Sequence, residues 1–92
     1  MKIDFDPEKD AKNIKSHGVS LAKAANLAWE KAYCWLDERY PYDETRMRGL
    51  VPLDNILYHV VFVERNEFMR IISLRRAEPS EVKNYVQNYY DA

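Results

Sequence analysis

The second half of the chain carries the pattern that most restricts its fold. From Tyr33 onward, aromatic and β-branched residues alternate along the sequence, and Pro41, Gly49 and Pro52 interrupt the run. Alternation of this kind is typical of strands that each show one face to a core. We expect four strands, near residues 32–36, 45–50, 56–64 and 68–74. Short turns at residues 54–55 and 65–67 would join the last three strands into an antiparallel meander.

The first half reads as a short strand followed by helices. Residues 1–5 alternate, and Asp6-Pro7-Glu8 then supplies an N-cap, a proline at the first helical position and an acidic first turn. Gly18 is placed to end this helix in the left-handed conformation. Ser20 can cap a second helix, whose apolar residues recur at helical spacing: Leu21, Ala24, Ala25 and Ala28.

Pro79 opens a last helix with an apolar stripe at i, i+3, i+4 and i+7. We expect this stripe to pack on the sheet, and a partner-binding face is the alternative. The stripe consists of Val82, Tyr85, Val86 and Tyr89.

Composition limits the class of protein. At 92 residues, with 47% hydrophobic and 32% charged residues, the chain is expected to form one domain over residues 1–92. Acidic residues interrupt the N-terminus where a signal peptide would be apolar, so we expect a cytoplasmic protein without a membrane segment. A net charge of −1 gives no overall attraction to nucleic acid.

The only cysteine, Cys34, excludes an internal disulfide and a multi-cysteine zinc site. Its neighbours Tyr33 and Trp35 favour a buried structural thiol. The two histidines, His17 and His59, are far apart in sequence, so we expect neither a metal site nor a cofactor. His59 lies in an apolar run and is interpreted as a structural sheet histidine.

Residues 70–76 concentrate positive charge on a strand that leads into the last helix. Strict alternation places Arg70, Ile72, Leu74 and Arg76 on one face, with Ile71, Ser73 and Arg75 on the other. A guanidinium group suits a phosphate or a carboxylate. We therefore expect this strand to hold an anion, with one of Arg75 and Arg76 at the site and the other bridging Glu78 or Glu81, or contacting a partner.

Several strings in this order resemble the BrnT family of ribonuclease toxins from bacterial type II toxin–antitoxin systems. They are Phe5-Asp6, a helix with Asn13, residues 17–21 (HGVSL), residues 43–46 (DETR), residues 70–77 (RIISLRRA), Glu81 and Tyr85. The resemblance implies an α+β RelE-like domain, with an antiparallel sheet of about four strands flanked by two N-terminal helices and one C-terminal helix. It also implies RNA cleavage, and a BrnA-like ribbon-helix-helix antitoxin that neutralises the toxin and binds operator DNA with it.

Metal-independent RNA cleavage needs a base, an acid and fixed cations. We hypothesise that Glu44 is the base, His17 the acid or a phosphate donor, and Arg46 and Arg75 the electrostatic clamp. Further substrate contacts are expected from Lys12, Arg70, Ser73 and Arg76. The structural alternatives are that His17 serves a helix C-terminus and that Glu44 only pairs with Arg46 or Arg48.

Two other functions remain open at this point. The family commonly has a lysine where this chain has Ser16. This difference and the near-neutral charge motivate a second hypothesis, a catalytically silent module that binds the antitoxin and acts only in operon regulation. A general RNA-binding domain is a weaker alternative. The chain also holds more aromatic residues than its core needs, which predicts a protein interface formed from Trp29, Trp35, Tyr40, Tyr42, Tyr89 and Tyr90.

Overall fold

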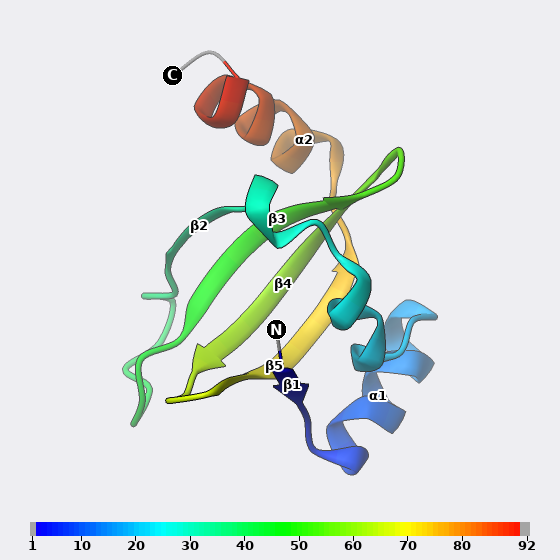
Figure 1. Ribbon diagram of the computed structural model, residues 1–92, viewed down its shortest axis with the longest axis vertical. Helices are drawn as coiled ribbons and strands as arrows, with labels where there is room; N and C mark the ends of the chain where they lie inside the picture. Colours follow the sequence, from blue (N-terminus) through cyan, green and yellow to red (C-terminus); the bar gives the residue numbers. More distant parts are fainter. Residues whose placement is uncertain (1, 91–92) are drawn as a thin grey trace.

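A five-stranded mixed sheet forms the centre of the protein in the computed structural model, which describes residues 2–90 (Figure 1). The strand order is β1-β5-β4-β3-β2, with β1 parallel to β5 and the other neighbours antiparallel. The strands are β1 (Lys2–Asp4), β2 (Tyr33–Leu36), β3 (Met47–Leu53), β4 (Ile56–Glu64) and β5 (Phe68–Arg76).

The α+β class and the meander β3-β4-β5 are confirmed, but the antiparallel four-strand sheet is wrong in detail. The short N-terminal strand joins the same sheet as a parallel edge strand, because the helical segments after it carry the chain across one face. Pro52 lies inside β3 instead of interrupting it. The Pro52 carbonyl points to the edge of β3 that lies away from β4, where it accepts the Ala28 N–H at 2.8 Å. The N–H that proline lacks would point to the same edge, so the pairing with β4 does not need it.

Helix α1 (Pro7–His17) begins and ends as the sequence predicts. The Asp6 carboxylate accepts the Glu8 N–H at 2.9 Å. Gly18 has a φ of 72°, and its N–H donates to the Ile14 carbonyl at 2.8 Å.

The second predicted helix is instead two 3₁₀ segments, η1 (Leu21–Asn26) and η2 (Trp29–Lys31). The buried residues of this region, Leu21, Ala24 and Leu27, recur every third position. That spacing matches the three residues per turn of a 3₁₀ helix, which explains why Ala25 is exposed.

The hydrophobic core lies between η1 and one face of the sheet. Trp29 packs edge-on against Phe62, with ring centroids 5.3 Å apart, so this aromatic serves the core. The buried core consists of Leu21, Ala24, Leu27, Val51, Tyr58, Val60, Phe62, Ile71 and Leu74.

An irregularity in β5 decides which side chains reach the opposite face. Ser73 pairs with Val61, whereas Ile71 pairs with Phe62, so Ile72 is an extra, unpaired residue of a β-bulge. Ile71 and Leu74 therefore both face the core. The prediction that Arg70 shares a face with Ile72, Leu74 and Arg76 is wrong, because the bulge moves Arg70 to the face of Ser73 and Arg75.

We call the side of the sheet away from η1 the arginine face. From β2 to β5, the register assigns to it Tyr33, Trp35, Arg48, Leu50, His59, Val61, Val63, Arg70, Ser73 and Arg75. Cys34 points the other way on edge strand β2. It is exposed, so the prediction of a buried thiol is wrong. Partial burial, followed by the charge of Glu64, nevertheless raises the pKa of this thiol, which disfavours a nucleophile.

The amide of Asn13 attaches α1 to the edge of β5. Its Nδ2 donates to the Leu74 carbonyl at 2.7 Å and to the Val19 carbonyl at 2.8 Å, and its Oδ1 accepts the Leu74 N–H at 3.1 Å. Strand β1 pairs only with residues 68–70 of β5, so the side chain stands in for a neighbouring strand.

Helix α2 (Pro79–Tyr85) continues as a π-helical turn, η3 (Val86–Tyr90). Tyr85 is buried, and its hydroxyl donates to the Lys31 carbonyl at 2.6 Å. The expectation that the whole stripe packs on the sheet is wrong, because Val82, Val86 and Tyr89 are 43%, 42% and 37% exposed. Within residues 2–90, no helix has the length and apolar character needed to span a membrane.

We expect Asn13→Ala to destabilise the protein by about 2–4 kcal/mol, because it leaves a buried N–H and two carbonyls without their partner. Lys12→Ala on the exposed side of the same helix is the control and should change stability by less than about 0.5 kcal/mol. Urea unfolding measures both variants. Equal stability of the two would contradict the role given to Asn13.

Candidate functional site

Guanidinium groups line the arginine face in a row. Arg46 directly precedes β3, and its carbonyl accepts the Asp37 N–H at 2.8 Å, which extends the pairing of β2 with β3. Arg46 and Arg48 therefore point to the same side. On β5, Arg75 lies directly opposite His59 of β4. Arg48 lies between Arg46 and Arg75 along this face.

Arg75 forms a two-point ion pair with Glu81 of α2. Its terminal nitrogens lie 2.7 and 3.0 Å from the two carboxylate oxygens, and Glu81 also accepts the Glu78 N–H at 2.8 Å. Burial raises the pKa of Glu81, but the hydrogen bonds from Arg75 and from the Glu78 backbone outweigh it and lower the pKa to about 2. The pair holds α2 against the end of the sheet.

His59 lies between Arg48 and Arg75 and is 2% exposed. Its Nε2 accepts a hydrogen bond from Arg48 Nε at 3.1 Å and lies 4.0 Å from Glu81 Oε2. Burial, followed by the charge of Arg75, lowers the pKa of His59 to about 4. The ring is therefore neutral near pH 7, with its proton on Nδ1, a buried atom without a hydrogen-bond partner among the described residues.

Arg48 differs from its neighbours in having no carboxylate partner within residues 2–90. Its guanidinium group stacks on the Trp35 ring at 5.2 Å, and only Nε is bound, by His59. The other arginines of this face, Arg46, Arg70 and Arg75, all pair with carboxylates. A cavity of about 560 Å³ adjoins Arg48 and is lined by Tyr33, Trp35, Arg48, Ser80, Glu81 and Asn84.

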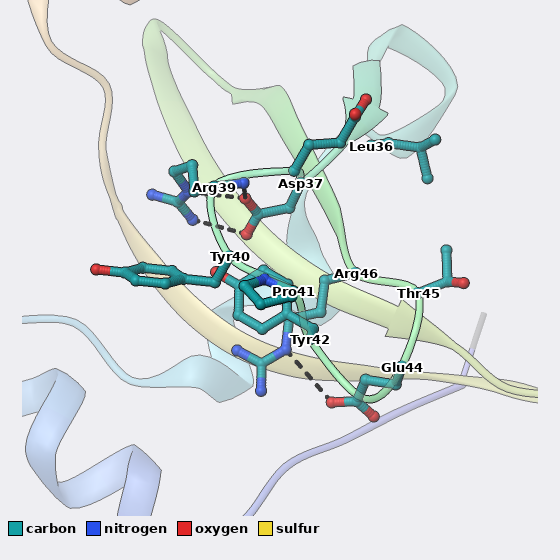
Figure 2. Close-up of a pocket in the computed structure, with 10 residues that line it drawn as sticks. Leu36, Asp37, Arg39, Tyr40, Pro41, Tyr42, Glu44, Thr45 and Arg46 are labelled. Carbon is teal, nitrogen blue, oxygen red and sulfur yellow. Dashed lines mark hydrogen bonds and ion pairs between the residues drawn. The ribbon is translucent and has the colours of Figure 1, made fainter.

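The loop between β2 and β3 forms a second cavity of about 460 Å³ (Figure 2). Arg39 binds the buried Asp37 carboxylate through Nε and a terminal nitrogen, both at 2.8 Å, and these hydrogen bonds lower the pKa of Asp37. Figure 2 shows the Glu44 carboxylate directed at Arg46, with an N–O distance of 3.3 Å. The Arg46 guanidinium group also lies over the Tyr42 ring at 4.3 Å.

The residues proposed from sequence do not form one cluster. Glu44 and Arg46 lie together in the loop, and Glu44 also pairs with Arg65 at 3.4 Å. Arg75 lies on the same face, roughly 13 Å away along the strand direction, since four residues of β3 separate Arg46 from the level of Arg75. Arg48, which was not among the site residues predicted from the sequence, lies between Arg46 and Arg75.

His17 lies elsewhere, at the end of α1. With Lys9, Lys12, Asn13, Ser16 and Ile72 it lines a hollow of about 250 Å³ that shares no residue with the other two cavities. Arg70 pairs with Asp4 at 2.9 Å, and Ser73 lies opposite Val61 on the arginine face.

Arg76 is exposed and lies opposite Tyr58 on the other face of the sheet. It is Arg75, rather than Arg76, that binds Glu81. Among residues 2–90, no three His, Cys, Asp or Glu side chains gather closely enough to hold a metal ion.

The fold and the arginine face define a small α+β domain with a surface suited to an anionic ligand. A family model described as the ribonuclease toxin, BrnT, of type II toxin–antitoxin systems matches residues 5–81. The chain therefore belongs to this family of ribonuclease toxins, whose type implies an antitoxin partner. A search of curated proteins finds no match.

The low pKa of His59 predicts a loss of stability in mild acid. The unfolded histidine binds a proton near its ordinary pKa of 6.5, whereas the folded one binds it only near pH 4, so stability falls as the pH falls through this interval. From about pH 7 to about pH 5 the loss should be about 2 kcal/mol. His59→Gln, which keeps an acceptor for Arg48 without titrating, should remove most of it. Urea unfolding at both pH values is the measurement, and an unchanged pH dependence in the variant would contradict the assignment.

Proposed function

We propose that this chain is a metal-independent endoribonuclease that binds single-stranded RNA along the arginine face. The observation that carries the proposal is Arg48, whose terminal nitrogens have no carboxylate partner among the described residues, in a row with Arg46 and Arg75. Aromatic rings accompany this row, since Trp35 stacks on Arg48 and Tyr42 on Arg46. Guanidinium groups alternating with aromatic rings suit phosphates and unstacked bases.

The chemistry that we propose takes place at the loop cavity. Glu44 removes the proton of a ribose 2′-hydroxyl, and the 2′-oxygen attacks phosphorus. The bond from phosphorus to the 5′-oxygen breaks, and the departing oxygen takes a proton from water, which produces a 2′,3′-cyclic phosphate and a 5′-hydroxyl end. Arg46 stabilises the charge that develops on the phosphate, and Arg75 binds the RNA backbone farther along the same face. The side chains of Glu44 and Arg46 are 33% and 22% exposed, so both are accessible to RNA.

The remaining proposed contacts extend this path. Arg70 and Ser73 share the arginine face, and their position supports contacts with the RNA backbone. His17 and Lys12 lie outside this face, so we propose that they bind a more distant phosphate and take no part in proton transfer. Arg76 lies on the other face of the sheet, and we propose that it contacts the antitoxin.

We also propose that a cognate ribbon-helix-helix antitoxin neutralises the chain in the cytoplasm, and that the complex represses its own operon. The exposed apolar side chains of Val82, Val86 and Tyr89 on α2 and η3 support a partner at this end of the protein. Helix α2 also supplies Glu81, which holds Arg75. A partner bound to α2 therefore lies beside the arginine row and can block RNA.

We expect Glu44→Gln to slow RNA cleavage by about 10²–10⁴-fold and Arg46→Gln by about 10²–10³-fold, because these changes remove the base and a fixed cation. Cleavage of a labelled RNA by the purified chain in EDTA, with analysis of the product ends, is the measurement. Lys83→Gln, on the exposed side of α2, is the control. Full activity in both variants, activity that requires a metal, or 3′-phosphate ends formed without a cyclic intermediate would contradict the mechanism.

We expect Val86→Asp to weaken binding to the cognate antitoxin at least about tenfold, because it places a charge on the apolar surface of η3. RNA cleavage should be unchanged. Ile14→Asp is a matched control, since Ile14 is an exposed apolar residue (48%) on α1. Titration of the purified partners measures the affinity, and equal effects of the two variants would contradict this placement. Normal growth on induction, with partner binding retained, would favour the silent regulatory module.

A further inference from the structure

We propose that the cavity between β2, β3 and α2 binds one unstacked guanine base of the RNA and that Arg48 recognises it. This inference rests on the proposed function in one respect, which is that RNA lies on the arginine face. It adds a base preference that the cleavage chemistry does not require.

The walls of the cavity suit the flat faces of a nucleobase. Tyr33 and Trp35 lie side by side on β2, with ring centroids 5.3 Å apart and planes inclined by 38°. Ser80 and Asn84 of α2 form the opposite wall, and the volume of about 560 Å³ is in the range of small-molecule sites. A base that enters here can stack on the aromatic rings while α2 contacts its edge.

The polar groups available in the cavity are mostly donors. Arg48 uses Nε for His59, which leaves its two terminal nitrogens as donors. Asn84 accepts from Asn88 through Oδ1 at 2.6 Å, so its Nδ2 is the group left for a ligand. Both oxygens of Glu81 are bound by Arg75, and Oε1 also accepts the Glu78 N–H, so Glu81 has little acceptor capacity left. The Tyr33 and Ser80 hydroxyl groups can donate or accept. The two terminal nitrogens of Arg48 only donate, so they match a pair of adjacent acceptors on a base edge.

Guanine has such an edge, with O6 beside N7, and arginine binds this pair of acceptors through two nitrogens. Adenine presents an amino donor in place of O6, and this donor would face the guanidinium group. Uracil alternates acceptors with a donor. Cytosine has two adjacent acceptors, O2 and N3, but an amino donor lies next to them, and both pyrimidines have a smaller stacking surface. The arrangement thus favours guanine over the other three bases.

Arg48 is held in place before any ligand arrives. The neutral His59 accepts its Nε at 3.1 Å, and the Trp35 ring supports the plane of its guanidinium group at 5.2 Å. A side chain that is already fixed loses less conformational entropy when it binds. His59 is on this basis a positioning residue for Arg48.

The test uses the full chain and uncleavable 2′-O-methyl oligonucleotides of about five residues, with uracil at every position but the centre. The central base is guanine, adenine, cytosine or 7-deazaguanine, which lacks only the N7 acceptor. Fluorescence anisotropy should show guanine binding about tenfold more tightly than adenine or cytosine, with most of the gain lost for 7-deazaguanine. Equal affinities, a preference for cytosine or adenine, or equal binding of guanine and 7-deazaguanine would overturn the proposal.

Arg48→Lys keeps the charge but removes the two-nitrogen fork, so it should bring the ratio of guanine to adenine affinity close to one while general affinity stays within a few-fold. Lys83→Gln is the control and should leave the ratio unchanged. Cleavage of the unmodified oligonucleotides separates the two proposals. Cleavage without a guanine preference in binding contradicts the guanine pocket alone, whereas guanine-selective binding without cleavage contradicts the catalytic proposal alone.

Discussion

The bulge at Ile72 is the constraint on which the arrangement of this protein depends. One extra residue in β5 lets Ile71 and Leu74 both enter the core, although their spacing of three does not fit a regular strand. The same residue moves Arg70 to the face that carries Arg75. Without the bulge, strict alternation would place Ile71 and Leu74 on opposite faces, so one of them would leave the core, and Arg70 and Arg75 would also lie on opposite faces.

Several arginines on one face of a small sheet repel one another, and nearby carboxylates reduce this repulsion. Asp4, Glu44 and Glu81 each pair with one arginine of this face or its loop, and Asp37 pairs with Arg39. These carboxylates fix the guanidinium groups and lower the net charge of the surface. Arg48 is held differently, by a neutral histidine and an indole ring, so its charge stays available to a ligand.

Helix α2 links the arginine face to the partner surface that we propose. Glu81 and Tyr85 attach it through Arg75 and the Lys31 carbonyl, while Val82 and Val86 on the same helical segment stay exposed. The attachment combines the ion pair of Glu81 with Arg75, the hydrogen bond of the Tyr85 hydroxyl and the buried Tyr85 ring. A protein that binds the exposed apolar side chains can therefore act on the position of Glu81, and through it on Arg75.

Local signals in the sequence determined much of the fold. The cap at Asp6, the left-handed Gly18 and the alternating strands from Tyr33 gave correct elements, because each depends on neighbours along the chain. The 3₁₀ geometry of η1 was not predicted from the sequence, although the three-residue spacing of Leu21, Ala24 and Leu27 indicates it. The parallel pairing of β1 was missed as well, because it depends on where the helical segments bring the chain back to the sheet.

The sequence showed which types of residue the candidate site contains, but it did not show which of these residues lie close together. The sequence by itself determined the family resemblance and the strand origin of the arginines, and it offered Arg46 or Arg48 as the ion-pair partner of Glu44, since these depend on nearby positions. Only the tertiary structure decided that His17 lies apart, that Arg48 and His59 join the arginine row, and that Arg75 binds Glu81. Strand register and the bulge set these contacts, and both result from packing between segments that are distant along the chain.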